Sequence, residues 1–175
     1  YIEYILGYEP CKLCLYQRIP YIISIFICFV GYNYFKNVKI GIIISEWNSE
    51  ITKKLYDGAK KTLIDFGYND IITEYVPGSF ELPIASQIIL EKNSLDAVIC
   101  LGCVIKGETK HFDFICNTTA NGIKDVSLKY NIPVIFGVLT DNNIQQSIER
   151  SGGKYGNKGV EAAISAIKMI SILKK

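Results

Sequence analysis

The sequence predicts a three-layer α/β/α sandwich with a four-stranded parallel sheet, preceded by an apolar N-terminal helix. Three observations support this prediction. From residue 38 onward, runs of β-branched residues alternate with longer amphipathic segments, which is the pattern of parallel strands joined by helices. The runs are apolar along their whole length, as expected for strands that are covered on both faces. A stretch near the front, residues 19–35, contains no charged residue.

The order of the elements follows from the spacing of apolar residues. The run VKIGIIIS has no polar alternation and predicts the first strand. The next segment repeats an apolar residue every fourth position, which predicts a helix capped by Asn48 or Ser49 and ended by Gly67. The same reasoning applied along the chain predicts strands over 38–45, 71–76, 96–101 and 133–139, and helices over 50–66, 80–92, 112–130, 142–150 and 158–173.

Composition and charge exclude several functional classes. The chain has 175 residues, of which 49% are hydrophobic, so it can bury a sizeable core and is neither disordered nor collagen-like. The 19 basic and 17 acidic side chains leave a net charge of +2, which is too small to indicate a nucleic-acid partner.

Binding sites in parallel sheets lie beyond the carboxyl ends of the strands. Four segments of this sequence are expected there: Glu46–Asn48, Pro77–Glu81, Gly102–His111 and Thr140–Asp141. His111 is the only histidine of the chain. Histidine suits general acid–base catalysis because it exchanges protons near neutral pH, although a histidine near a helix start is also a common surface residue.

The segment Gly102–Thr109, GCVIKGET, nearly matches a nucleotide phosphate-binding loop. Glu108 stands where that motif requires lysine, so we do not expect a nucleoside triphosphate. A turn that contains glycine and leads into a helix can still hold a smaller anion.

The six cysteines do not form one disulfide framework. Three lie in the first 28 residues and the others are Cys100, Cys103 and Cys116. Cys100 and Cys103 are three apart in a strand and therefore point to opposite faces. With one histidine and no second cysteine pair nearby, we expect no metal, and we interpret these three as small apolar fillers.

Two aromatic residues and one acid are expected at neighbouring strand ends. Trp47, the only tryptophan, follows the first strand, and Phe80 and Glu81 follow the second. Together they suit a planar heterocycle with hydrogen-bond donors, whereas a simple turn and helix cap explains only the Pro-Gly-Ser part of that segment.

Arg150 has an ordinary explanation as a cation in the last turn of a helix. That helix begins at the carboxyl end of the fourth strand and runs backward, so Arg150 should lie away from His111 of the same chain. If both residues serve one site, the site must lie between subunits.

From residue 38 to residue 174 the chain resembles lumazine synthase, with a flavodoxin-like fold. The likeness rests on GIIISEWNSEIT, VPGSFELP, DAVICLGCVIKGETKHFDF, IPVIFGVLT and IERSGGKYGNKGVEAA, all in one collinear register. It implies the condensation of 5-amino-6-(D-ribitylamino)uracil with 3,4-dihydroxy-2-butanone 4-phosphate to 6,7-dimethyl-8-ribityllumazine, a step of riboflavin biosynthesis. It also implies that the reaction uses neither a metal nor an organic cofactor.

The resemblance assigns roles residue by residue. It implies proton transfer by His111 and contact with the butanone phosphate by Glu108, Thr109 and, from a neighbouring subunit, Arg150. Lys158 and Glu161 match positions associated with the same site. The residues that it implies around the ring substrate are Trp47, Ser79, Phe80, Glu81, Cys103, Val104, Ile105 and, from the neighbour, Phe136. The family usually has Ala or a similar small residue at the position of Cys103.

The resemblance further implies a homo-oligomer with sites between subunits. Family members form pentamers, decamers of two pentamers or sixty-subunit shells. The short GGKYGNKG link resembles that of shell-forming members, and the catalytic domain is expected in the cytoplasm.

The front, residues 1–35, resembles disulfide-bond formation protein B, through EPCKLCLYQR and the apolar run behind it. At about 17 residues, the run reaches the lower limit for a membrane span, and a buried helix is the alternative. Since one cysteine pair and one span are only part of that family, we expect a fusion or a gene-boundary artefact. Two other functions stay open: a membrane thiol-redox fragment, and a flavodoxin-like binding module without catalysis.

Overall fold

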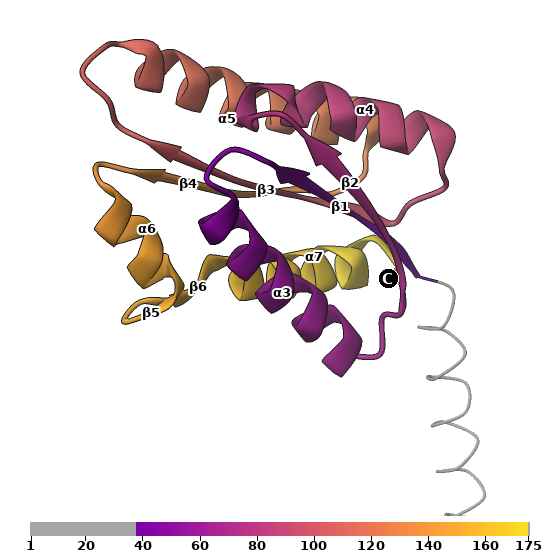
Figure 1. Ribbon diagram of the computed structural model, residues 1–175. Helices are drawn as coiled ribbons and strands as arrows, with labels where there is room; N and C mark the ends of the chain where they lie inside the picture. The colour runs from indigo at the N-terminus through magenta and orange to yellow at the C-terminus, as the bar shows by residue number, and fades with distance from the viewer. Residues whose placement is uncertain (1–37, 175) are drawn as a thin grey trace, which may run out of the picture. The chain divides into compact units, whose positions relative to one another are not determined.

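The computed structural model describes residues 38–174, which form one α/β domain around a parallel sheet (Figure 1). Its strands are β1 (Lys39–Ser45), β2 (Asp70–Val76), β3 (Ala97–Ile105) and β4 (Val134–Asp141), in the order β2-β1-β3-β4. All neighbouring pairs are parallel. This is the order of the first four strands of flavodoxin-like sheets, so the predicted architecture is confirmed for this part of the chain.

Helices cover both faces of the sheet, which gives three layers. Figure 1 shows α4 and α5 on one face and α3, α6 and α7 on the other. Their bounds are α3 (Ser49–Asp65), α4 (Leu82–Lys92), α5 (His111–Tyr130), α6 (Ile144–Arg150) and α7 (Lys158–Leu173). A short 3-10 helix, η1 (Ser79–Glu81), precedes α4, and a small hairpin of β5 (Ser151–Gly153) and β6 (Gly156–Asn157) separates α6 from α7.

The strands contribute side chains to two separate cores. Ile42 and Ile44 pack with α3 and α7, whereas Ile43 packs with α4 and α5. This alternation explains why the runs are apolar throughout, because each fully buried Ile adds about 1.5–3 kcal/mol of stability on either face. Cys103 belongs to the first core and Cys100 to the second, so the prediction that they face opposite sides is confirmed.

The helices α3 and α7 approach each other closely at Gly159. A Cβ atom added to Gly159 would lie 1.9 Å from the backbone oxygen of Leu55. Only glycine permits this approach, which places the start of α7 against the middle of α3.

The third strand is longer than the sequence predicts. It was expected to end at residue 101, but it continues to Ile105 because it stays paired with β4 as far as Ile105 opposite Asp141. Half of the segment Gly102–Thr109 is therefore strand, and the glycine-containing turn is confined to residues 106–110. The prediction of a loop that begins at Gly102 was wrong.

Asn48 immediately precedes α3, but its side chain does not cap the helix. Its backbone is left-handed, with φ of 57°, and its side-chain amide donates to the Cys103 carbonyl oxygen at 2.9 Å. The predicted end of the helix is confirmed, since Gly67 has φ of +87°. The predicted apolar segment at residues 19–35 lies outside the described residues. None of the described helices has the length and apolar character needed to span a bilayer.

Candidate active site

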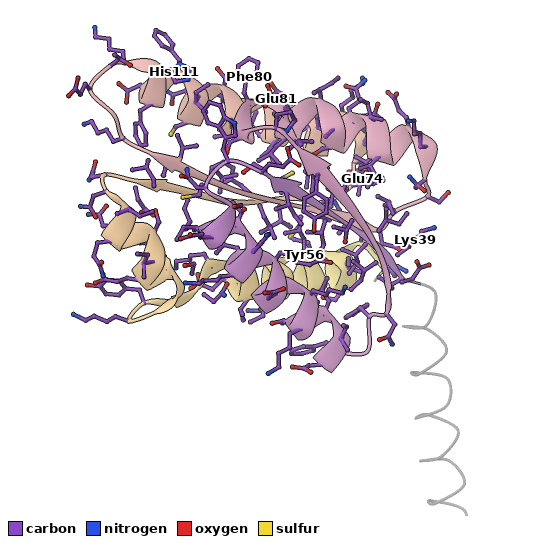
Figure 2. All side chains as sticks on the ribbon, in the orientation of Figure 1. Lys39, Tyr56, Glu74, Phe80, Glu81 and His111 are labelled. Carbon is purple, nitrogen blue, oxygen red and sulfur yellow. The ribbon has the colours of Figure 1, made fainter. Side chains whose placement is uncertain are left out.

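A hollow of about 660 Å³ opens beyond the carboxyl ends of β1, β2 and β3. We call it the aromatic hollow. It brings together nine of the predicted site residues: Trp47, Ser79, Phe80, Glu81, Cys103, Val104, Ile105, Thr109 and His111. Figure 2 shows His111, Phe80 and Glu81 on one side of the molecule, whereas Lys39, at the start of β1, lies at the opposite end of the sheet. Glu108 is exposed in the loop before α5 and does not line this hollow.

Backbone hydrogen bonds hold the loops after β1 and β2 together. Glu46 N donates to Val76 O at 2.8 Å, and Trp47 N donates to Pro77 O at 3.2 Å. The Trp47 loop therefore continues the parallel pairing beyond the strand and lies beside the segment that carries Phe80. The Trp47 and Phe80 side chains are 70% and 51% exposed, so their rings are available to stack on a flat ligand.

The segment η1 packs against Gly102 of β3 and is hydrogen-bonded to Thr119 of α5. A Cβ atom on Gly102 would lie 2.6 Å from Ser79 Oγ, so the lack of a side chain at Gly102 leaves room for the Ser79 hydroxyl against β3. The Ser79 carbonyl oxygen accepts a hydrogen bond of 3.0 Å from Thr119 Oγ1 in α5. Both contacts position the backbone that precedes Phe80 and Glu81.

His111 is the first residue of α5 and lies exposed at the rim of the aromatic hollow. Its backbone N–H donates to Thr109 Oγ1 at 3.4 Å, which ties the turn to the helix start. An imidazole at this place can exchange protons with a bound molecule.

A second hollow, of about 560 Å³, lies beside β4, α6 and α7. We call it the basic hollow. Its lining includes the predicted residues Phe136, Arg150, Lys158 and Glu161. Among the described residues, the two hollows share no lining side chain. The prediction that Arg150 and His111 of one chain lie apart is in agreement with this arrangement.

The Arg150 side chain turns back toward the carboxyl end of β4. Its Nη1 donates to the Gln146 carbonyl oxygen at 3.0 Å, and its Nε lies 3.8 Å from Asp141 Oδ1. The guanidinium carbon lies 5.1 Å from the centroid of the Tyr155 ring. In the same hollow, Lys158 Nζ donates to both carboxylate oxygens of Glu161 at 2.7 and 2.8 Å.

The buried cysteines are unsuited to nucleophilic or metal chemistry. Burial raises the pKa of the Cys100 thiol to about 12. Burial, followed by the nearby Asp141 charge, also raises the pKa of Cys103, against a lowering by its hydrogen bond to Ser147. Both thiols therefore stay protonated near neutral pH. Cys116 is only half-buried, so the filler interpretation fits it less well. Within residues 38–174, no group of three His, Cys, Asp or Glu side chains is placed to hold a metal.

Three residues at the site were given no role there from the sequence, although Asn48 and Asp141 lie in segments that were expected at the strand ends. Asn48 ties the Trp47 loop to β3, Ser147 donates to Asp141 Oδ2 at 2.8 Å, and Asp141 faces Arg150. The position of Asp141 at a strand end was a usable signal, whereas Ser147, in the middle of a short helix, gave none.

Taken together, the fold and the hollows define a parallel α/β domain with a small-molecule site beyond its strand ends. The chain belongs to the 6,7-dimethyl-8-ribityllumazine synthase family, whose family model matches residues 37–174. A second model, for disulfide bond formation protein DsbB, matches residues 1–49. The two matches overlap at residues 37–49, of which Lys39–Ser45 form β1 and Ser49 begins α3 of the described domain.

Curated relatives agree with the family assignment. Three proteins named 6,7-dimethyl-8-ribityllumazine synthase come from Cytophaga hutchinsonii, Flavobacterium johnsoniae and Parabacteroides distasonis. The first is 56% identical over 133 residues, which cover 75% of this chain and 84% of the relative. The second is 57% identical over 139 residues, or 78% of this chain and 73% of the relative. The third is 50% identical over 136 residues, or 77% and 85%.

Proposed function

We propose that residues 38–175 form a transferase that condenses 5-amino-6-(D-ribitylamino)uracil with 3,4-dihydroxy-2-butanone 4-phosphate. The product is 6,7-dimethyl-8-ribityllumazine, released with inorganic phosphate and water in the penultimate step of riboflavin biosynthesis. Membership of the family and the names of the relatives support this proposal. The single observation that carries it from the structure is the gathering of nine expected residues around one hollow that holds the only histidine.

The aromatic hollow would take the uracil ring. Its volume lies in the usual range for small-molecule sites, and two exposed aromatic rings, Trp47 and Phe80, offer flat surfaces to the ring. Ser79, Glu81 and the backbone of Cys103, Val104 and Ile105 would supply polar contacts. His111 would move protons as the amine adds to the ketone, the carbinolamine loses water, phosphate leaves and the ring closes with loss of a second water.

The basic hollow would hold the butanone phosphate for a neighbouring chain. Arg150 and Lys158 line it and attract anions, and the exposed Phe136 ring would complete the neighbour's ring site. The two hollows of one chain share no lining residue, which supports a site that two copies complete. We therefore propose a homo-oligomer, a pentamer or a multiple of pentamers. Holding two substrates together in this way can be worth up to about 7–11 kcal/mol of the barrier.

We further propose a cytoplasmic catalytic domain, with residues 1–37 as a separate segment that any membrane attachment would use. The match of residues 1–49 to the DsbB family supports a second candidate function, a thiol-redox fragment that carries the domain. Cys11 and Cys14 would do that chemistry.

One experiment separates these functions. The full chain is mixed with both substrates, and lumazine formation is followed by fluorescence while thiol oxidation is followed in parallel. Lumazine formation that persists when Cys11 and Cys14 are replaced by serine supports the synthase. Binding of the uracil without product would favour a non-catalytic module. Thiol oxidation that depends on Cys11 and Cys14, without lumazine, would favour the redox fragment.

A further inference from the structure

The basic hollow contains two cations, and an acid accompanies each of them. Arg150 Nε lies 3.8 Å from Asp141 Oδ1, and Lys158 Nζ lies 2.7 Å from Glu161 Oε2. The formal charges of these four side chains cancel. A hollow that only had to bind an anion tightly would not need this balance, so the acids require an explanation of their own.

The two pairs differ strongly in exposure. The Asp141 side chain is 8% exposed, whereas the Glu161 side chain is 56% exposed. Water and salt screen an exposed pair, which leaves it with little effect. A buried carboxylate is screened much less, so its charge acts over a longer distance. Asp141 is therefore the acid whose charge most lowers the positive potential of the hollow.

Two consecutive buried hydrogen bonds hold Asp141 in place. They reach its Oδ2 atom, whereas Arg150 lies near its Oδ1 atom. Ser147 Oγ donates to Asp141 Oδ2 at 2.8 Å, and the Cys103 thiol donates to Ser147 Oγ at 3.4 Å. Cys103, Ser147 and Asp141 are all buried. These hydrogen bonds stabilise the charged carboxylate in its place, so Asp141 does not have to follow Arg150 when that side chain meets a ligand.

Arg150, in turn, has contacts that do not involve Asp141. Its Nη1 donates to the Gln146 carbonyl oxygen at 3.0 Å, and its guanidinium lies over the Tyr155 ring at 5.1 Å. These two contacts remain when the charge of Asp141 is removed. Asp141 therefore acts on an anion in this hollow mainly through its charge, and only secondarily by placing Arg150.

We propose that Asp141 is a built-in counterion that lowers the affinity of the basic hollow for phosphate groups, so that a phosphate can bind there and leave again. The proposal rests on the proposed function, in which this hollow receives a phosphate ester and releases inorganic phosphate. Asp141 is an affinity-setting residue here, because it competes with the phosphate for the Arg150 guanidinium.

The test measures binding of inorganic phosphate to the full chain by titration calorimetry at constant ionic strength. Asp141→Asn keeps the shape of the side chain and can still accept the hydrogen bond from Ser147, but it removes the charge. We expect the dissociation constant for phosphate to fall about tenfold, because a buried charge close to the anion is lost. Glu161→Gln removes the exposed acid instead, and it should lower the dissociation constant for phosphate by less than about twofold.

A second variant changes the hydrogen bond and keeps the charge. Ser147→Ala removes the donor to Asp141 Oδ2, so the carboxylate depends more on Arg150 for stabilisation. We expect phosphate binding to weaken about twofold, in line with the loss of one hydrogen bond to a charged group that its neighbours partly replace. The two variants thus shift the dissociation constant in opposite directions.

Unchanged or weaker phosphate binding in an Asp141→Asn protein that assembles like the wild type would overturn the proposal. Tighter binding in both variants would also overturn it, because Ser147→Ala leaves the charge in place. The lumazine assay separates this result from the proposed function. If the variants show the expected phosphate shifts and the wild type forms no lumazine, the result supports the counterion and contradicts the synthase. If the wild type forms lumazine and the variants show no such shifts, the result supports the synthase and contradicts the counterion.

Discussion

The two hollows differ in what holds their side chains in place. Around the aromatic hollow, main-chain contacts dominate, such as Trp47 N to Pro77 O at 3.2 Å and the Asn48 amide to Cys103 O at 2.9 Å. Around the basic hollow, charged side chains contact one another, as Lys158 and Glu161 do at 2.7 Å. The register of the sheet thus shapes the first hollow, and electrostatics shape the second. The first should respond to changes of shape and the second to changes of charge.

The largest expected effect comes from removing His111, the proposed proton-transfer group of the aromatic hollow. His111→Ala should lower kcat by about a hundredfold to ten-thousandfold, because general acid–base catalysis contributes that much. The KM values of both substrates should change little. Steady-state kinetics with each substrate varied in turn measures this. Lys110→Ala, an exposed neighbour that lines neither hollow, is the matched control, and a loss of the same size there would refute the role of His111.

Removing the cation of the basic hollow should act on one substrate. Arg150→Ala should raise the KM of the butanone phosphate about tenfold to a hundredfold, as expected for lost hydrogen bonds to a charged group, and leave the KM of the uracil near its wild-type value. Lys154→Ala is the control, because Lys154 also lies over the Tyr155 ring, at 5.4 Å, but does not line the hollow. An equal loss for both substrates would contradict the division between the hollows.

The same two variants test whether a site joins two chains. When His111→Ala and Arg150→Ala proteins are unfolded together and reassembled in equal amounts, about one quarter of wild-type activity should return at butanone phosphate concentrations well below the KM of the Arg150→Ala protein, because a quarter of random pairings join two intact hollows. Each variant reassembled alone is the control. If the mixture stays as inactive as its components, the site lies within one chain.

A smaller effect is expected at the mouth of the aromatic hollow. Trp47→Ala should raise the KM of the uracil about threefold to tenfold, the range of an aromatic contact, whereas Trp47→Phe should stay close to wild type. Fluorescence titration with the uracil alone gives the same comparison without turnover. Equal losses in both variants would mean that the indole acts by something other than stacking.

The smallest effect is expected from salt. A rise in ionic strength from about 0.05 to 0.5 M shortens the screening length, so the KM of the butanone phosphate should rise about twofold while that of the uracil stays constant. The titration is done with sodium chloride and with potassium chloride, because an effect of ionic strength should be the same in both salts. A parallel rise of both KM values would show that the two hollows do not differ in their dependence on charge.

Much of the fold could be predicted from local spacing. The runs at residues 38–45 and 133–139 became β1 and β4, and the apolar repeat after Asn48 became α3, because periodicity is a local property of the chain. The site residues on these strand ends came together because parallel strands all end at one edge of the sheet. That rule alone brought Trp47 near Phe80.

Other features depended on contacts between segments that are distant in sequence. The extension of β3 to Ile105 came from its pairing with Asp141 on β4. Asn48 has the residue type of a helix cap, but its side chain found the Cys103 carbonyl, 55 residues away, instead. No spacing rule reports such partners.

The sequence by itself therefore determined the parallel α/β layers, the edge of the sheet at which the aromatic hollow opens and the separation of Arg150 from His111, since each follows from periodicity and chain direction. Only the tertiary structure decided which charges face each other. The placement of Asp141 between Ser147 and Arg150 depends on how α6 packs against the end of β4. That packing is set by the shapes of side chains from several elements, which no local pattern records.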